Sequence, residues 1–141
     1  MNLLMILVIC AAVLALAFAA FNFFKVKKMP EGTEQMSEIA SAIRVGANAF
    51  ISYEYKVLYT VVAVVAVIMA IVTTWHAALA LLIGSIMSGC AGMIGMKIAT
   101  YANVRVSNKA RETEDIGETV KVAFRGGSVM GLCVGGFALL G

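Results

Sequence analysis

Charged residues occur in only two parts of this sequence, residues 25–56 and 97–125, and long apolar runs surround them. A helix needs about 20 mainly apolar residues to cross ~30 Å of hydrocarbon, and the runs are long enough for this. Only 13% of the residues are charged and the mean hydropathy is +0.95, whereas a soluble domain has roughly 25% charged residues. The sequence therefore predicts an all-α integral membrane protein.

The apolar runs predict four transmembrane helices in a single membrane region over residues 1–141. The spans fall at about residues 3–24, 57–75, 77–96 and 120–141, and two polar segments, 25–56 and 97–119, separate them. Trp75 and His76 would then form the whole connection between the second and third spans. We therefore expect those two spans to be antiparallel neighbours.

The first span has a competing interpretation as a cleaved signal peptide. Ala17, Phe18 and Ala19 resemble a small-x-small cleavage site. However, the sequence before Leu3 lacks a positively charged region, and the apolar run is longer than that of a signal peptide. Both features favour a retained first helix.

Basic residues fix the expected orientation. All eleven lysines and arginines lie between residues 25 and 56 or between 97 and 125, and Arg125 marks an end of the last span. Because basic loops stay cytoplasmic, the N-terminus and the C-terminus are both expected outside. This topology also accounts for the net charge of +3, so we expect no nucleic-acid partner.

The segment before the second span has two possible forms. Pro30, Glu31 and Gly32 break the chain, and Thr33 is placed to cap a new helix. That helix is either an extension of the second span or a separate surface helix. The absence of a turn signal between Gly46 and Val57 favours the extension.

The third span is also expected to continue beyond the membrane, from Lys97 past Arg105, with the next break at Gly117. An acidic patch at Glu112–Glu118 follows the basic residues. It could be proposed as a metal site, but we expect its carboxylates to be solvated and to offset Arg105, Lys109 and Arg111.

Small residues predict where the last two spans pack. Gly127, Gly131 and Gly135 recur at four-residue spacing and so share one face of the last helix. The third span carries similar rows, including Gly84, Ser88 and Gly92. Small residues allow close approach of helices in lipid, so we expect the two faces to meet.

Residues able to do chemistry are scarce. No span carries a carboxylate, which a proteolipid rotor subunit or a small multidrug exporter of this size would need to bind its ion. The single aspartate, Asp115, and the single histidine, His76, give no ligand set for a metal. Cys10, Cys90 and Cys133 lie in apolar runs, where a thiol acts as a small hydrophobe. We predict no catalytic, cofactor-binding or metal residue in this chain.

Three ordered segments carry a family resemblance. GTEQMSEIASAIRVGANAFISYEYK (32–56), GMIGMKIATYANVRVSNKAR (92–111) and VKVAFRGGSVMGL (120–132) resemble the region after the first helix in membrane-bound, ion-pumping pyrophosphatases. Their order and spacing also resemble that family. The resemblance covers essentially Gly32 to Gly141.

The resemblance implies a sixteen-helix bundle in a homodimer that hydrolyses inorganic pyrophosphate with Mg²⁺, and in some members K⁺, and moves H⁺ or Na⁺ outward. This chain would supply the first four helices, in the outer ring, and would contact membrane lipid and the remaining helices of the same protein. The family's aspartate-rich motifs have no counterpart here, so no site residue is carried over. We therefore expect an N-terminal fragment that is inactive alone, from a prokaryotic plasma membrane. The alternative is a freestanding four-helix structural subunit.

Overall fold

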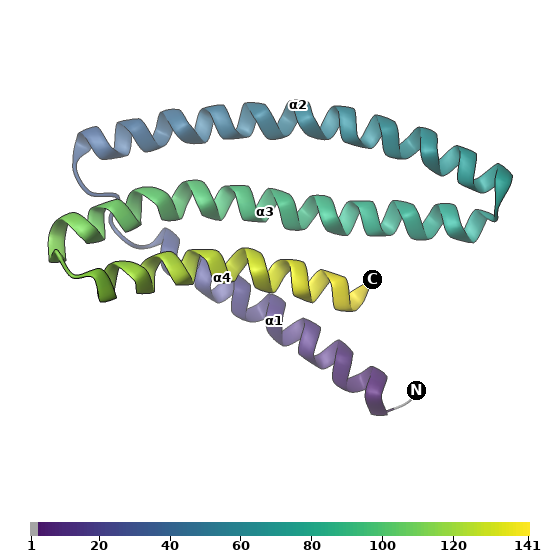
Figure 1. Ribbon diagram of the computed structural model, residues 1–141, viewed down its shortest axis with the longest axis horizontal. Coiled ribbons are helices and arrows are strands. Elements are labelled where there is room, and N and C mark those ends of the chain that lie inside the picture. Colours follow the sequence, from purple (N-terminus) through teal and green to yellow (C-terminus); the bar gives the residue numbers. More distant parts are fainter. Residues whose placement is uncertain (1–2) are drawn as a thin grey trace.

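The computed structural model describes residues 3–141 and is all-helical (Figure 1). It contains four helices, α1 (Leu3–Lys27), α2 (Glu34–Val72), α3 (Trp75–Thr113) and α4 (Ile116–Leu140). Each of the four is long and apolar enough to cross a membrane. The predicted fold class is confirmed at this level, although α4 begins four residues before the predicted span.

Helices α2 and α3 form a long antiparallel hairpin (Figure 1). Each has 39 residues, which corresponds to about 58 Å of helix at 1.5 Å per residue. The segment before the second span is therefore a continuous extension of it and not a separate surface helix. Thr33 caps α2 as predicted, since its hydroxyl accepts a hydrogen bond of 3.3 Å from the Met36 backbone N–H.

Helix α4 packs between α3 and α1, while α2 packs only against α3. The order across the molecule is thus α2, α3, α4, α1. Small and β-branched side chains make up the core, which allows the helix axes to approach closely. The core residues are Ala19, Val26, Ala91, Ile98, Ala102, Val129 and Cys133.

Two predicted turns lie elsewhere in the structure. Thr73 and Thr74 connect α2 to α3, and Thr74 caps α3 by accepting from the Ala77 N–H at 3.3 Å. Trp75 and His76 are instead the first residues of α3. The sequence does not identify this turn, because threonine occurs in helices as well as at caps and only local backbone geometry separates the two uses.

The break before α4 was also misplaced. Glu114 ends α3 in the left-handed conformation (φ 50°), and Asp115 caps α4 by accepting from the Gly117 N–H at 2.7 Å. Gly117 is therefore a residue of the first turn and not the turn itself. Aspartate is among the best N-cap residues, and this was the signal to follow.

The predicted glycine face of α4 does not meet α3. A Cβ atom built on Gly127, Gly131 or Gly135 would have no neighbour within 4 Å, so this face is open among residues 3–141. The close contacts come from two other glycines. A Cβ on Gly126 would lie 2.7 Å from the Ala102 Cβ of α3, and one on Gly136 would lie 2.8 Å from Leu16 of α1.

Candidate functional site

The densest polar cluster of the described residues lies where α1 ends and the chain turns into α2. It consists of Glu31, Arg44, Tyr101 and Arg105, called here the Glu31 cluster. The Arg105 side chain is only 5% exposed. Its guanidinium donates three hydrogen bonds, to the carbonyl oxygens of Met29 (2.9 Å), Lys27 (2.9 Å) and Tyr101 (2.8 Å).

The hydrogen bonds to the Lys27 and Met29 carbonyls cap the C-terminal end of α1. The last carbonyls of a helix have no partner within it, and a cation there also offsets the negative end of the helix dipole. Arg105 supplies both from α3, across the sequence. The prediction that acidic residues 112–118 neutralise a solvated Arg105 is therefore wrong.

Glu31 links Arg105 to α2. Its carboxylate is 3.2 Å from Nη1 of Arg105 and accepts two hydrogen bonds from Arg44, at 2.7 and 3.2 Å. The Ser37 hydroxyl donates a further one at 3.0 Å. The hydrogen bonds from Arg44, with those from Ser37 and the charge of Arg105, lower the pKa of Glu31 below its ordinary value despite partial burial.

The Tyr101 ring lies among three cations. Its centroid is 5.1 Å from the Arg44 guanidinium, 5.5 Å from that of Arg105 and 5.5 Å from the Lys27 ammonium. A ring face attracts cations at this range, and more strongly where water is partly excluded. The ring thus offsets part of the repulsion among three positive groups around one carboxylate.

The turn itself is fitted to α3. Gly32 has φ +100°, a conformation that side chains disfavour, and a Cβ there would lie 2.5 Å from the Asn108 Oδ1. Asn108 is buried and holds its position through Glu112 (2.9 Å) and Arg111 (3.0 Å). Glycine is therefore required for both reasons.

The acidic patch does not converge. Glu112 accepts from Asn108, Asp115 caps α4, and Glu118 pairs with Lys121 at 2.6 Å on an exposed surface. Within residues 3–141, no group of three or more histidine, cysteine, aspartate or glutamate residues could hold a metal ion. All three cysteines are free thiols, and His76 lies beside Trp75 with ring centroids 4.0 Å apart and ring planes tilted by 42°.

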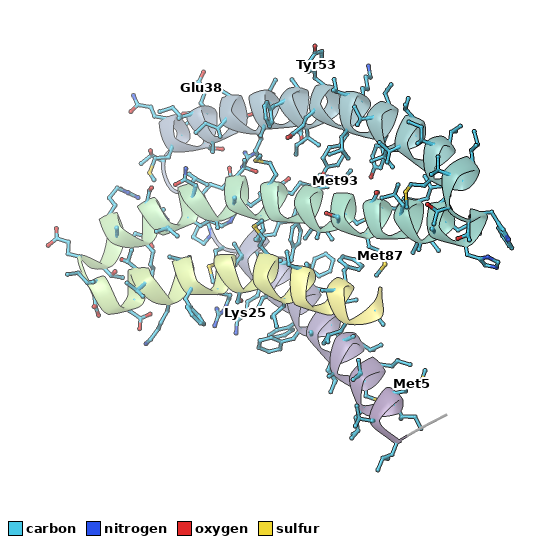
Figure 2. All side chains as sticks on the ribbon, turned by 45° about the vertical axis from the view of Figure 1, so that its right-hand side comes forward. Met5, Lys25, Glu38, Tyr53, Met87 and Met93 are labelled. Carbon is cyan, nitrogen blue, oxygen red and sulfur yellow. The ribbon has the colours of Figure 1, made fainter. Side chains whose placement is uncertain are left out.

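Two polar contacts join the helices inside their apolar parts. The buried Asn22 amide of α1 donates to the Ser128 hydroxyl of α4 at 3.3 Å, and the Tyr55 hydroxyl of α2 donates to the Gly89 carbonyl of α3 at 2.6 Å. Tyr55 therefore faces α3. Tyr53 projects outward with 74% exposure, as an interfacial tyrosine should (Figure 2).

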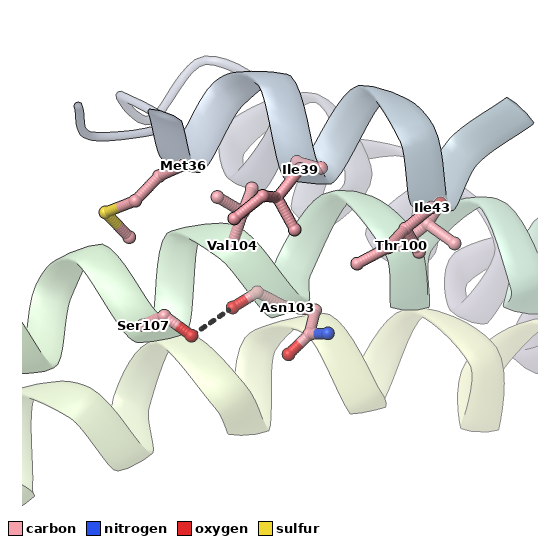
Figure 3. A pocket seen from close by; sticks show the side chains of 8 residues that line it. Met36, Ile39, Ile43, Thr100, Asn103, Val104 and Ser107 are labelled. Carbon is pink, nitrogen blue, oxygen red and sulfur yellow. Dashed lines mark hydrogen bonds between the residues drawn. The ribbon is translucent and has the colours of Figure 1, made fainter. Parts of the chain in front are cut away.

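A small groove separates the parts of α2 and α3 that lie beyond the predicted spans (Figure 3). Its volume is about 190 Å³, and α2 contributes mainly apolar side chains such as Ile39. On the α3 wall, the Ser107 hydroxyl donates to the Asn103 carbonyl oxygen at 3.1 Å. No charged side chain lines it, and the Thr100 and Ser107 hydroxyls both donate to backbone carbonyl oxygens of α3.

Four apolar helices whose polar contacts serve packing define a multi-pass integral membrane protein. Within that class, the chain belongs to the inorganic H⁺ pyrophosphatase family, whose family model matches residues 13–141. The family predicted from the three sequence segments is thus confirmed.

Relatives in this family are named as pyrophosphate-driven pumps. The chain is 56% identical over 127 residues to a "K(+)-stimulated pyrophosphate-energized sodium pump" of Thermotoga maritima, which covers 90% of this chain and 18% of the relative. It is 40% identical over 130 residues to a "K(+)-insensitive pyrophosphate-energized proton pump 2" of Moorella thermoacetica, covering 92% of this chain and 19% of the relative. The chain therefore spans about a fifth of the length of these relatives.

Proposed function

We propose that this chain forms the N-terminal, outer-ring helices of a pump that couples inorganic pyrophosphate hydrolysis to the export of H⁺ or Na⁺. The observation that carries the proposal is the 56% identity to a pyrophosphate-energised sodium pump over 90% of this chain. A relative in Moorella thermoacetica is named as a proton pump, so the proposal includes both H⁺ and Na⁺ as the ion that is moved.

Within such a pump, these helices act as a scaffold and carry no catalytic group. The Glu31 cluster supports this role, because its charged groups bind one another and the end of α1. Among residues 3–141, no group of three or more histidine, cysteine, aspartate or glutamate residues is placed to hold a magnesium ion. The Mg²⁺ and K⁺ implied by the family would therefore bind to other helices of the whole protein, as would pyrophosphate.

The basic end of the bundle, which holds the Glu31 cluster, is proposed to face the cytoplasm of a prokaryotic cell. The distribution of lysine and arginine supports this orientation. The start of α1 and the end of α4 both lie away from this basic end (Figure 1). A further prediction from the family is that the whole protein is a homodimer.

Two measurements test the proposal. The purified 141-residue chain should release no phosphate from pyrophosphate in the presence of Mg²⁺, and appreciable turnover would contradict a purely scaffolding role. The genomic DNA after the Gly141 codon should continue in frame and encode clustered aspartates. An immediate stop codon would instead support the alternative, a freestanding four-helix structural subunit.

A further inference from the structure

A second polar feature adjoins the Glu31 cluster and shares Arg44 and Tyr101 with it. It is a cavity of about 590 Å³ between α1, α2 and α3, at the basic end of the bundle. Three basic side chains line it, Lys27, Arg44 and Lys97, and no acidic side chain does. The other lining residues are Phe23, Asn48, Ile51, Ser52, Met93, Thr100 and Tyr101.

The two lysines carry the charge that is available to a ligand. Arg44 is already bridged to Glu31 at 2.7 Å. Lys27 and Lys97 are both exposed, and neither belongs to the salt bridges found within residues 3–141. Asn48 and Ser52 add neutral groups that donate hydrogen bonds, whereas the Thr100 hydroxyl already donates to the Lys97 carbonyl at 2.9 Å. Ammonium groups with neighbouring donors suit a phosphate.

The lining also has a fixed order along the helices. Phe23 precedes Lys27 by one turn in α1, and Met93 precedes Lys97 by one turn in α3. In both helices the apolar residue is the one nearer the centre of the span. Ile51 of α2 likewise lies closer to the second span than Arg44 does. In α1 and α3 the lining therefore has a polar level and an apolar level that lies deeper in the membrane, whereas in α2 the apolar Ile51 is next to the polar Ser52.

This two-level lining separates an amphiphile from a simple anion. A free phosphate would leave the apolar level in contact with water, whereas a phospholipid would cover that level with its acyl chains. Basic pockets between transmembrane helices are suited to anionic headgroups. We propose that this cavity binds the headgroup of an anionic phospholipid, with its acyl chains against Phe23, Ile51 and Met93.

Native mass spectrometry of the protein, with all the sequence its gene encodes, tests this proposal in neutral detergent. Phosphatidylglycerol should bind with a measurable Kd, and phosphatidylcholine much more weakly. The double variant Lys27→Gln/Lys97→Gln should weaken phosphatidylglycerol binding about 25-fold, since each lysine contributes about fivefold. The matched control is Lys25→Gln/Lys28→Gln, which removes equal charge from the same end of the bundle but outside the cavity lining. It should change the Kd less than about twofold.

A steric pair of variants covers the case in which the lysine variant folds poorly. Ser52→Trp fills the cavity without a change in charge and should abolish tight binding. Ser41→Trp, on an exposed face of α2 outside this cavity, should leave binding unchanged. Equal losses in the test and control variants would overturn the proposal in favour of general attraction between charges. Displacement of the lipid by inorganic phosphate would overturn it in favour of a simple anion site. Binding that survives Ser52→Trp would also overturn the proposal, because the lipid would then bind outside this cavity.

Discussion

Nη1 of Arg105 lies 3.2 Å from Oε1 of Glu31, which joins the C-terminal part of α3 to the turn that separates α1 from α2. The same guanidinium caps α1, so one side chain connects three parts of the chain. Removal of one partner of a buried charge pair costs more than the pair contributes, because the other partner is left without compensation.

We predict that Arg105→Met lowers the stability of the chain by about 2–4 kcal/mol, because the carbonyls of Lys27 and Met29 lose their partner and Glu31 loses one of its two arginines. Arg105→Lys should recover only part of the loss, since an ammonium cannot reproduce the planar guanidinium. Thermal unfolding in detergent, followed by circular dichroism, measures the effect. Lys56→Met, at an exposed position, is the control. Equal apparent Tm values for Arg105→Met and the control would contradict the capping role.

Glu31 predicts a dependence of stability on pH. Its pKa is lowered in the folded state, first by the hydrogen bonds from Arg44. The resulting stabilisation is therefore complete above the unfolded pKa, near the ordinary value of 4.5, and is lost as the pH falls through the lower folded pKa. Glu31→Gln should cost about 1–2 kcal/mol at neutral pH.

The measurement is the apparent Tm between neutral and strongly acidic pH. The gap between the wild type and Glu31→Gln should narrow only below the ordinary glutamate pKa. Glu34→Gln, which changes an exposed carboxylate in the next turn, should show no such gap. A constant gap across the whole range would rule out the ionised Glu31 as its source.

Neighbouring glycines in α4 should respond differently to the same change. Gly126→Ala places a Cβ 2.7 Å from that of Ala102 and should lower stability by about 1–3 kcal/mol, because neither backbone yields easily. Gly127→Ala meets nothing within 4 Å and should be neutral or stabilising, since alanine is favoured over glycine in helices by about 1 kcal/mol. Both variants gain the same helix propensity, so their difference in Tm isolates the contact. A lower Tm for Gly127→Ala than for Gly126→Ala would show that α4 is rotated about its axis relative to this structure.

The hairpin of α2 and α3 should depend on Tyr55. Tyr55→Phe removes the 2.6 Å hydrogen bond to the Gly89 carbonyl and should cost about 1 kcal/mol. Tyr53→Phe removes the hydroxyl from a side chain that is 74% exposed and should have little effect. Thermal unfolding of the two variants in the same detergent provides the comparison. A loss of stability in Tyr53→Phe but not in Tyr55→Phe would show that the face of α2 carrying Tyr53 packs against α3, which would contradict the structure.

The course of the chain through four helices could be read from the sequence because it depends on local and one-dimensional features. Lysines and arginines mark the ends of the apolar runs, and the proline and glycine near Thr33 mark the start of α2. The length of α2 followed from the lack of any turn signal after Gly46. These features act over a few residues, which is why they were sufficient.

The faces that pack could not be read as easily. The spacing of Gly127, Gly131 and Gly135 is suitable for close packing, but helix rotation is set by all the contacts of α4 together. The buried stripe of Val122, Gly126, Val129, Cys133 and Gly136 has its own helical period and was the stronger signal. The role of Arg105 depends on the end of α1, which is distant in sequence. No local pattern identifies such a partner.

The unbroken length of α2 and α3 has a mechanical consequence. Roughly half of each 58 Å helix is enough to cross the ~30 Å hydrocarbon core, so the other half projects beyond it. Neither helix contains a proline that could act as a hinge. Each helix is therefore expected to tilt as one rigid rod, so that its membrane part and its aqueous part move together. A tilt of one degree moves its far end by about 1 Å relative to its near end, so a reorientation within the lipid is transmitted to the aqueous side without any change in local structure.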